Sequence, residues 1–305
     1  MITSPIWLPA TLLAGGVQAW RTAVQRRVSQ SLSLNAAGLV RYLYGVPFTL
    51  MLLGGYRLVF PAPLPSVGPL FLLFCAAGGL AQIIATNLLI LAFTHRNFVV
   101  GTAYSKTEAA QGAVLSFLLL GERLSALAWA GIGCGVAGVM LLSTGGKRMG
   151  PGDFLRALGQ PAARAGIASG FFFALTAIGI RRATQTVETD DAVLAALMVL
   201  AVTVLLQTMM QGTYLLLREP GEMRRVFASW RVSGQVGLLS ALGSACWFTG
   251  FATAPVALVR IVGQIEVAFT MAFGHFYLKE AMRRSELVGL LLVVGGVVLA
   301  LAGAL

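Results

Sequence analysis

Long, continuously apolar segments separated by short polar breaks run through the whole 305-residue chain. A helix needs about 20 apolar residues to cross the hydrocarbon of a bilayer, whereas a barrel strand needs about 9–11 alternating residues. The segments here are long and do not alternate, so they predict membrane-spanning helices in an all-α integral membrane protein. We expect ten helices, at residues 6–24, 36–60, 66–93, 98–120, 124–143, 163–180, 191–217, 232–253, 256–278 and 285–304.

The composition agrees with this pattern and excludes several classes of protein. Apolar residues make up 57% of the chain and charged residues 11%, whereas a soluble domain carries about 25% charged residues. A chain this apolar cannot cover a water-exposed surface, so a soluble enzyme or nucleic-acid binder is excluded. The net charge of +11 is instead typical of loops held on the anionic cytoplasmic side of a membrane. Three isolated cysteines give no metal-binding or disulfide spacing.

The two halves of the chain repeat each other. Arg26-Arg27 and Arg181-Arg182 follow apolar segments at an offset of 155, and GERLS at 121–125 matches KEAMR at 279–283 at an offset of 158. At this second offset Glu108 falls on Glu266. We therefore expect a first five-helix repeat at 1–143, a linker at 144–162 and a second repeat at 163–305. Since five is odd, the repeats enter the membrane in opposite orientations, which is a transporter architecture with a site near the midplane.

The segment AVLSFLLLGERLSALAWAGIGCGVAGVMLL at 113–142 resembles the signature of the EamA-like, ten-helix branch of the drug/metabolite transporter superfamily. The second copy, at 276–301, fits more loosely, because Lys279 stands where the family usually has Gly. Ala109 and Val267 stand where many members have Pro, so no proline kink is expected at either position. The resemblance implies carrier-type transport of small metabolites, often export, without ATP hydrolysis by the protein itself.

Charged residues inside the predicted helices are the best candidates for a site, since each costs roughly 2.5–3.5 kcal/mol to insert unless it is paired or wetted. Lys106 and Glu108 lie about 200° apart on a regular helix, so their partners are expected on other helices or on a ligand. We expect the glutamates Glu108 and Glu266 to couple protons or form ion pairs, and the following residues to bind substrate: Arg41, Tyr104, Lys106, Arg260 and Gln264.

Two interpretations of these charges stay open. They either close as structural ion pairs between helices or line the transport pathway. Three cations against two carboxylates leave one positive charge, which favours a substrate with a carboxylate or phosphate, such as an amino acid or organic acid. If Lys106 is neutral, a zwitterion or neutral ligand fits equally well.

Small residues four apart let membrane helices approach closely. They recur at GIGCGVAG, residues 131–138, and at Gly289, Gly295 and Gly296. We expect the fifth and tenth helices to form a scaffold pair.

The orientation of the chain is left open by two arguments that conflict. The loops after odd-numbered helices hold 15 cations and those after even-numbered helices hold four, which places both termini outside the cytoplasm. The family resemblance implies that both termini lie inside.

The leading hypothesis is a secondary transporter in the cytoplasmic (inner) membrane that moves a small metabolite by alternating access, with protons as the candidate coupling ion. The alternative is a flippase for an amphiphile or lipid-linked substrate. An intramembrane enzyme is not expected, because no HExxH or GxSxG motif is present. We expect a monomer without cofactor, metal or nucleic-acid partner.

Overall fold

The computed structural model describes residues 2, 4–94, 104–143, 160–277 and 284–303. Within these ranges the chain is helical and has no strand, so the predicted fold class is confirmed. The helices are α1 (Trp7–Ser29), α2 (Leu34–Leu43), α3 (Gly45–Val59), α4 (Pro69–Thr94), α6 (Glu108–Leu120), α7 (Ala126–Ser143), α9 (Pro161–Gln185), α10 (Ala192–Arg218), α11 (Pro220–Ala228), α12 (Trp230–Thr253), α13 (Val256–Gly263), α14 (Glu266–Tyr277) and α15 (Arg284–Ala302). Each of the ten expected segments overlaps one of these helices or a consecutive pair, and residues 98–103, 278 and 304 of these segments lie outside the described part.

Several of these helices are long and apolar enough to cross a membrane. The described residues contain five such spans, of which the segment 192–218 has the highest mean hydropathy, 2.3. Shorter apolar helices lie at 108–120, 126–142 and 287–302. The protein is therefore a multi-pass membrane protein.

Besides the short break at Tyr44 between α2 and α3, two of the expected helices are not continuous, which corrects the sequence prediction. The segment 98–120 is interrupted at Lys106 and Thr107, and the segment 256–278 at Gln264 and Ile265. At the second interruption the backbone N–H groups of Gln264 and Ile265 donate to carbonyls three residues back, at 3.0 and 3.1 Å. Such tightened turns leave no trace in a hydrophobic pattern, and neither site contains proline.

Local signals in the sequence set several helix ends. Ser33 accepts a hydrogen bond from the backbone N–H of Ala36 and caps α2, while Asp191 accepts from two backbone N–H groups and caps α10. Gly121 ends α6 with φ +68°, a left-handed conformation that glycine adopts without strain. This glycine begins the GERL turn.

The helices group into two compact units, and each unit takes segments from both halves of the sequence. The first unit comprises residues 1–83 and 176–254, and the second comprises 84–175 and 255–305. Helices α4 and α9 each contribute one part to each unit. The expected repeat boundaries therefore divide the sequence into halves, whereas each compact unit combines parts of both halves. They stay a prediction, because residues 144–159 of the expected linker lie outside the described part.

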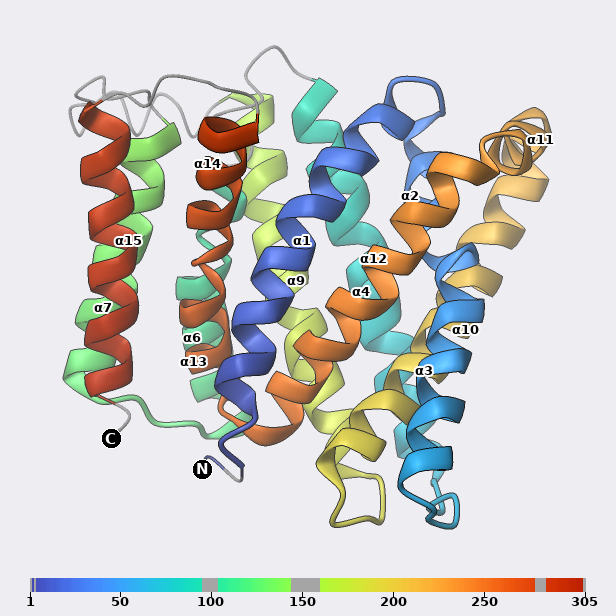
Figure 1. Cartoon of the computed structure of the whole chain (residues 1–305), viewed down its shortest axis with the longest axis horizontal. Helices are drawn as coiled ribbons and strands as arrows, with labels where there is room; N and C mark the ends of the chain where they lie inside the picture. Colours follow the sequence, from blue (N-terminus) through green and yellow to red (C-terminus); the bar gives the residue numbers. More distant parts are fainter. Residues whose placement is uncertain (1, 3, 95–103, 144–159, 278–283, 304–305) are drawn as a thin grey trace. The chain divides into compact units, whose positions relative to one another are not determined.

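In the first unit, α1 packs along α12, and α10 packs against α2, α3 and α12 (Figure 1). The indole Nε1 of Trp247 on α12 donates to Oε1 of Gln18 on α1 at 2.9 Å. Gly237 lies against Tyr44 between α2 and α3, where a Cβ would come within 2.4 Å of the Tyr44 carbonyl carbon. A side chain at position 237 would therefore push these helices apart.

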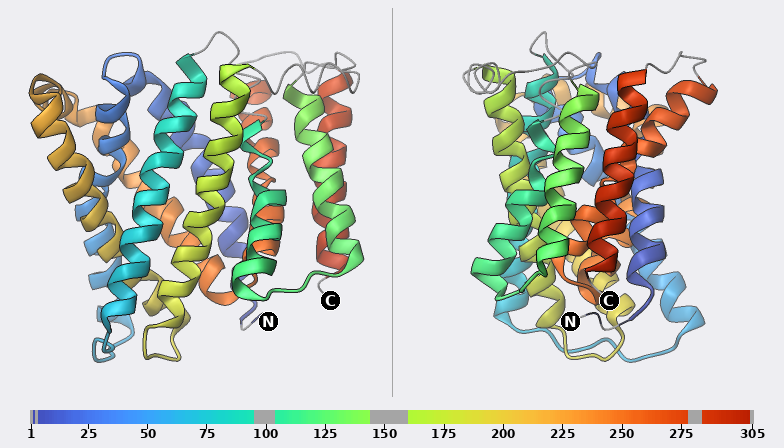
Figure 2. Two further views of the ribbon diagram at one scale, coloured as in Figure 1. Left: turned by 180° about the vertical axis from the view of Figure 1, so that it is seen from behind. Right: turned by 90° about the vertical axis from the view of Figure 1, so that its left-hand side faces the viewer.

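In the second unit, α7 and α15 pack side by side (Figures 1 and 2). A Cβ on Gly131 would lie 2.5 Å from the carbonyl oxygen of Gly296, and one on Gly138 would lie 2.7 Å from that of Gly289. In the repeat, residue 131 corresponds to 289 and residue 138 corresponds to 296. Gly131 therefore meets the counterpart of Gly138, and Gly138 meets the counterpart of Gly131. The equivalent helices therefore run antiparallel, as inverted repeats require, and the predicted scaffold pair is confirmed.

Candidate functional site

The two interruptions in the second unit occur at equivalent positions of the two repeats. At the offset of 158, Lys106 corresponds to Gln264 and Glu108 to Glu266. Glu108 is the first residue of α6, and Glu266 is the first residue of α14. The N-terminus of a helix carries a partial positive charge, so each break presents a carboxylate where the backbone stabilises it.

These carboxylates form ion pairs that cross between the repeats. The ammonium of Lys106, from the first repeat, lies 2.7 Å from a carboxylate oxygen of Glu266, from the second. The guanidinium of Arg260, on α13, pairs with Glu108 at the start of α6. Helices α6 and α13 lie side by side (Figure 1). Four of the five predicted charges therefore meet within one compact unit and form two ion pairs.

The four charged side chains are mostly but not fully buried. Between 10 and 19% of each remains exposed. Removing one partner of a buried ion pair costs about 3–5 kcal/mol, because the other charge is left without compensation. Arg260 is held further by a 3.0 Å hydrogen bond that it donates to the carbonyl oxygen of Phe173 on α9. The pairs thus fix α6, α13 and α14 at the breaks.

Gln264 is the counterpart of Lys106, but it makes no comparable contact. Its side chain is buried at 3% exposure, and neither amide atom has a hydrogen-bond partner among the described residues. It lies over Gly135 of α7, where a Cβ would come within 2.2 Å of the Gln264 Oε1. Leaving a buried polar group unsatisfied costs about 1–3 kcal/mol. Such a group is suited to a ligand that supplies the missing hydrogen bonds.

Two polar residues close to Glu108 along the chain, Gln111 and Tyr104, lie in different surroundings. Gln111 donates to the hydroxyl of Thr107 at 2.8 Å and to the carbonyl of Ile167 at 3.3 Å. Tyr104 is buried in an apolar cluster with Ala163.

Arg41 belongs to the first compact unit and not to the one that contains the crossed pairs. It is 5% exposed, and its guanidinium carbon lies 5.6 Å from the ring centre of Tyr42. The remaining six predicted site residues all belong to the second unit. Substrate binding by any of the seven stays a prediction.

Two further polar contacts were not expected from the sequence pattern. Glu122, in the GERL turn, accepts a 2.9 Å hydrogen bond from the backbone N–H of Val256 and so caps the start of α13. In the first unit, Arg181 is a buried residue of α9 that donates to the carbonyl of Phe251 at 2.6 Å, although the charge count had placed it in a loop. The counterpart of Glu122, at Glu280, lies outside the described residues.

A model of the EamA-like transporter family matches the chain twice, at residues 5–144 and 161–302. The chain belongs to the EamA-like transporter family. The two matched segments are its two halves, and the resemblance to the drug/metabolite transporter superfamily is thereby confirmed. As a family member it is a membrane transporter, and the crossed ion pairs lie within the matched segments.

Solved structures share the fold of this EamA-like transporter. One crystal structure has 18% sequence identity and a TM-score of 0.69, over 98% of this chain and 95% of the other. At this identity the likeness concerns the fold alone. No curated protein matches the chain in sequence.

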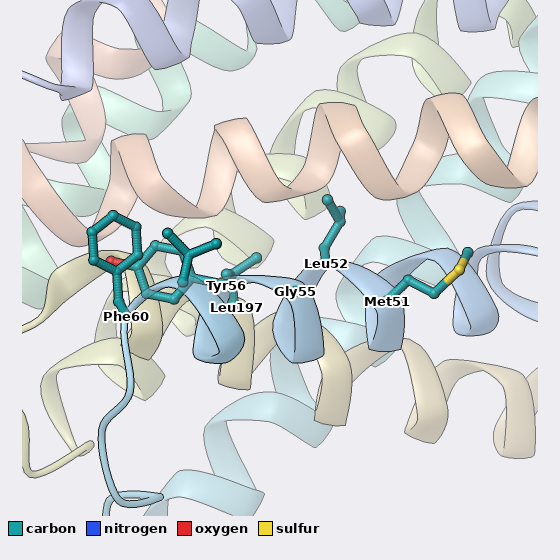
Figure 3. Close-up of a pocket in the computed structure, with 7 residues that line it drawn as sticks. Met51, Leu52, Gly55, Tyr56, Phe60 and Leu197 are labelled. Carbon is teal, nitrogen blue, oxygen red and sulfur yellow. The ribbon is translucent and has the colours of Figure 1, made fainter.

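The first unit of the transporter contains an apolar hollow (Figure 3). It has a volume of about 330 Å³ and is lined by residues of α3 and α10 and by Phe60, which follows α3: Met51, Leu52, Gly55, Tyr56, Val59, Phe60 and Leu197. Its one polar lining group, the Tyr56 hydroxyl, donates to the carboxylate of Asp191 at 2.9 Å. The hollow can accept an alkyl chain but has no charged residue in its lining.

Proposed function

We propose that this EamA-like protein is a secondary transporter that moves a small amino acid or organic acid out of the cell by alternating access. It would act as a monomer in the cytoplasmic membrane. The observation that carries the proposal is the pair of crossed ion pairs at the two helix breaks, Lys106–Glu266 and Arg260–Glu108. Charged groups at interrupted helices near a repeat interface are typical of substrate sites in transporters with inverted repeats.

The charge balance within the second unit favours a zwitterion. Two cations face two carboxylates there, so the surplus positive charge expected from the sequence depends on Arg41 of the other unit. A zwitterionic amino acid that binds between Arg260 and Glu108 brings one negative and one positive charge, so the net charge of the site does not change. Its carboxylate suits the forked guanidinium of Arg260, and its ammonium suits Glu108.

A purely anionic substrate requires a different balance. Its carboxylate competes with Glu108 for Arg260, and a proton on Glu108 removes this competition. An organic acid would therefore bind together with a proton. Glu108 is our first candidate for the coupling residue, because Lys106, Tyr104 and Gln111 are close to it along the chain.

The decisive variant is Glu108→Gln, which keeps the shape of the side chain and removes its titration. Purified protein in liposomes would be assayed for substrate exchange and, separately, for accumulation driven by a pH gradient. With the organic acid as substrate, which does not need a charged Glu108, we expect exchange to continue and accumulation driven by the pH gradient to fall to background. Unchanged pH-dependent accumulation would contradict the coupling role and leave Glu108 as a structural ion-pair member. Glu266→Gln tests the equivalent pair, and Glu222→Gln, on α11 outside the spans, is the control.

The substrate class is tested by counterflow with matched compounds. An amino acid, the amine that lacks its carboxylate and the acid that lacks its amine differ by one charge each. We expect the amino acid to exchange best, and the acid to exchange only at low pH. Exchange of the amine alone would contradict recognition by Arg260.

The apolar hollow on α3 and α10 favours the alternative, an amphiphile flippase, because it can hold an alkyl chain. The substitution Gly55→Leu fills the hollow without touching a charged residue, and a Cβ at Gly55 meets nothing within 4 Å. Loss of transport in this variant would favour the flippase. Unchanged amino-acid exchange would favour the ion-pair site.

A further inference from the structure

Helix α11 links the ends of two candidate membrane spans. It joins α10 and α12, both of which are long and apolar enough to span a membrane, with one residue between α10 and α11 and one between α11 and α12. Figure 1 shows α11 nearly end-on while α10 and α12 are seen from the side, so α11 crosses their ends. A nine-residue helix in this position lies along the bilayer–water boundary.

Both glutamates of this region form hydrogen bonds or ion pairs with other residues of the protein. Glu219, just before α11, accepts from the hydroxyl of Ser33 and, at 2.7 Å, from the side chain of Asn35. Glu222 accepts from the backbone N–H of Ser33 at 2.7 Å and pairs with Arg225. Arg225 also donates to the carbonyl of Ser31 at 2.6 Å. These contacts hold α11 against the α1–α2 turn.

Helix α11 and the adjoining ends of α10 and α12 carry exposed cations and aromatic rings. Arg224 lies about 200° around the helix from Glu222, and it is exposed together with Arg218 and Arg231. Phe227 is 57% exposed and Trp230 is 59% exposed, and the guanidinium of Arg231 lies 5.4 Å from the Trp230 ring centre. No carboxylate of the described residues forms an ion pair with Arg218, Arg224 or Arg231.

We propose that one surface binds the headgroups of anionic phospholipids. It is formed by Arg218 at the end of α10, Arg224 and Phe227 of α11, and Trp230 and Arg231 at the start of α12. The arginines supply charge for a phosphodiester. Trp and Phe sit in the headgroup region, where their rings are partly buried in lipid. The loop between α10 and α12 is also one of those that the charge count assigns to the cytoplasmic leaflet, whose surface is negative. A membrane is favoured over a protein partner because α11 is fixed at the ends of two spans.

The test measures phosphatidylglycerol and phosphatidylcholine retention by the purified full-length protein, using native mass spectrometry. Each arginine near an anionic surface contributes about fivefold to binding, so Arg224→Gln/Arg231→Gln is expected to weaken phosphatidylglycerol retention by about 30-fold at low salt. Phosphatidylcholine retention is expected to stay unchanged. The control, Arg123→Gln/Arg182→Gln, removes two exposed cations, one in the GERL turn and one in the last turn of α9, and is expected to behave as the unmodified chain does.

Equal phosphatidylglycerol retention by the double variant would overturn the proposal. An equal loss in the control would also overturn it, since net charge alone would then explain the binding. Soluble glycerol phosphate is the third arm, and displacement of lipid by it at equal concentration would show a free-phosphate site in place of a membrane contact. Thermal unfolding in phosphatidylcholine micelles checks that each variant is folded. The proposal does not depend on the transported substrate.

Discussion

Replacing Gly296 by Ala is expected to push α15 away from α7, whereas the same change at the preceding residue, Gly295, is not. A Cβ at position 296 would lie 2.6 Å from the carbonyl oxygen of Gly131 and 2.7 Å from the backbone nitrogen of Gly135. Both contacts are with backbone, which cannot rotate away as a side chain can. A Cβ at position 295 would meet nothing within 4 Å.

The magnitude follows from comparing the two variants. Alanine favours the helix over glycine by up to about 1 kcal/mol at either position, so this contribution cancels in the difference. Overpacking in a close-packed interior costs about 1–3 kcal/mol. Gly296→Ala is therefore expected to lower the free energy of unfolding by about 1–3 kcal/mol relative to Gly295→Ala.

The assay is reversible unfolding in mixed micelles, followed by steric trapping or by circular dichroism, with both variants under the same conditions. Gly131→Ala, on the facing helix, is expected to behave as Gly296→Ala does, since its Cβ would lie 2.5 Å from the Gly296 carbonyl oxygen. Gly133→Ala, where nothing lies within 4 Å, is its control. If Gly296→Ala and Gly295→Ala unfold with the same free energy, the backbone contact between α7 and α15 is not close, and the argument for antiparallel packing loses its support.

Two further outcomes are expected. The hydrogen bond from the backbone N–H of Ser33, assisted by Arg225, lowers the pKa of Glu222. The contribution of Glu222 to the docking of α11 is therefore fully present above the ordinary glutamate pKa. It is lost as the pH falls through the lower pKa of the folded state. Hydrogen exchange at the α1–α2 turn should rise in that acid range, and Glu222→Gln should abolish the pH dependence. Glu122→Ala removes the cap of α13 and should cost about 1–2 kcal/mol of unfolding free energy, with partial recovery in Glu122→Gln. A Glu122→Ala protein as stable as the unmodified chain would rule out this capping role.

The helices were largely predictable from the sequence because hydrophobicity is a local property. Ten apolar segments predicted ten helical segments, and glycine spacing predicted the pairing of α7 with α15. The interruptions at Lys106 and Gln264 were not predictable. Neither contains proline, and the backbone is held there by neighbours distant in the sequence, such as Gly170, where a Cβ would lie 2.9 Å from the Ser105 carbonyl oxygen.

For the candidate site, the sequence identified which residues are charged within apolar segments, but not their partners. The 200° separation of Lys106 and Glu108 on a regular helix correctly predicted that each would find its partner elsewhere. Only the tertiary structure showed that Lys106 pairs with Glu266 and Arg260 with Glu108. It also showed that Arg41 belongs to the other compact unit.

The sequence by itself determined that the chain spans a membrane, that it is duplicated and that its buried charges are few. These properties depend on composition and on spacing along the chain, which a single sequence contains in full. The tertiary structure decided which charges neutralise one another, where the helices break and that Gln264 is left without a partner among the described residues. The ion pair between Lys106 and Glu266, for example, joins residues 160 positions apart in the sequence. Such contacts depend on how the helices pack, because a side chain meets its partner only where two backbones approach each other.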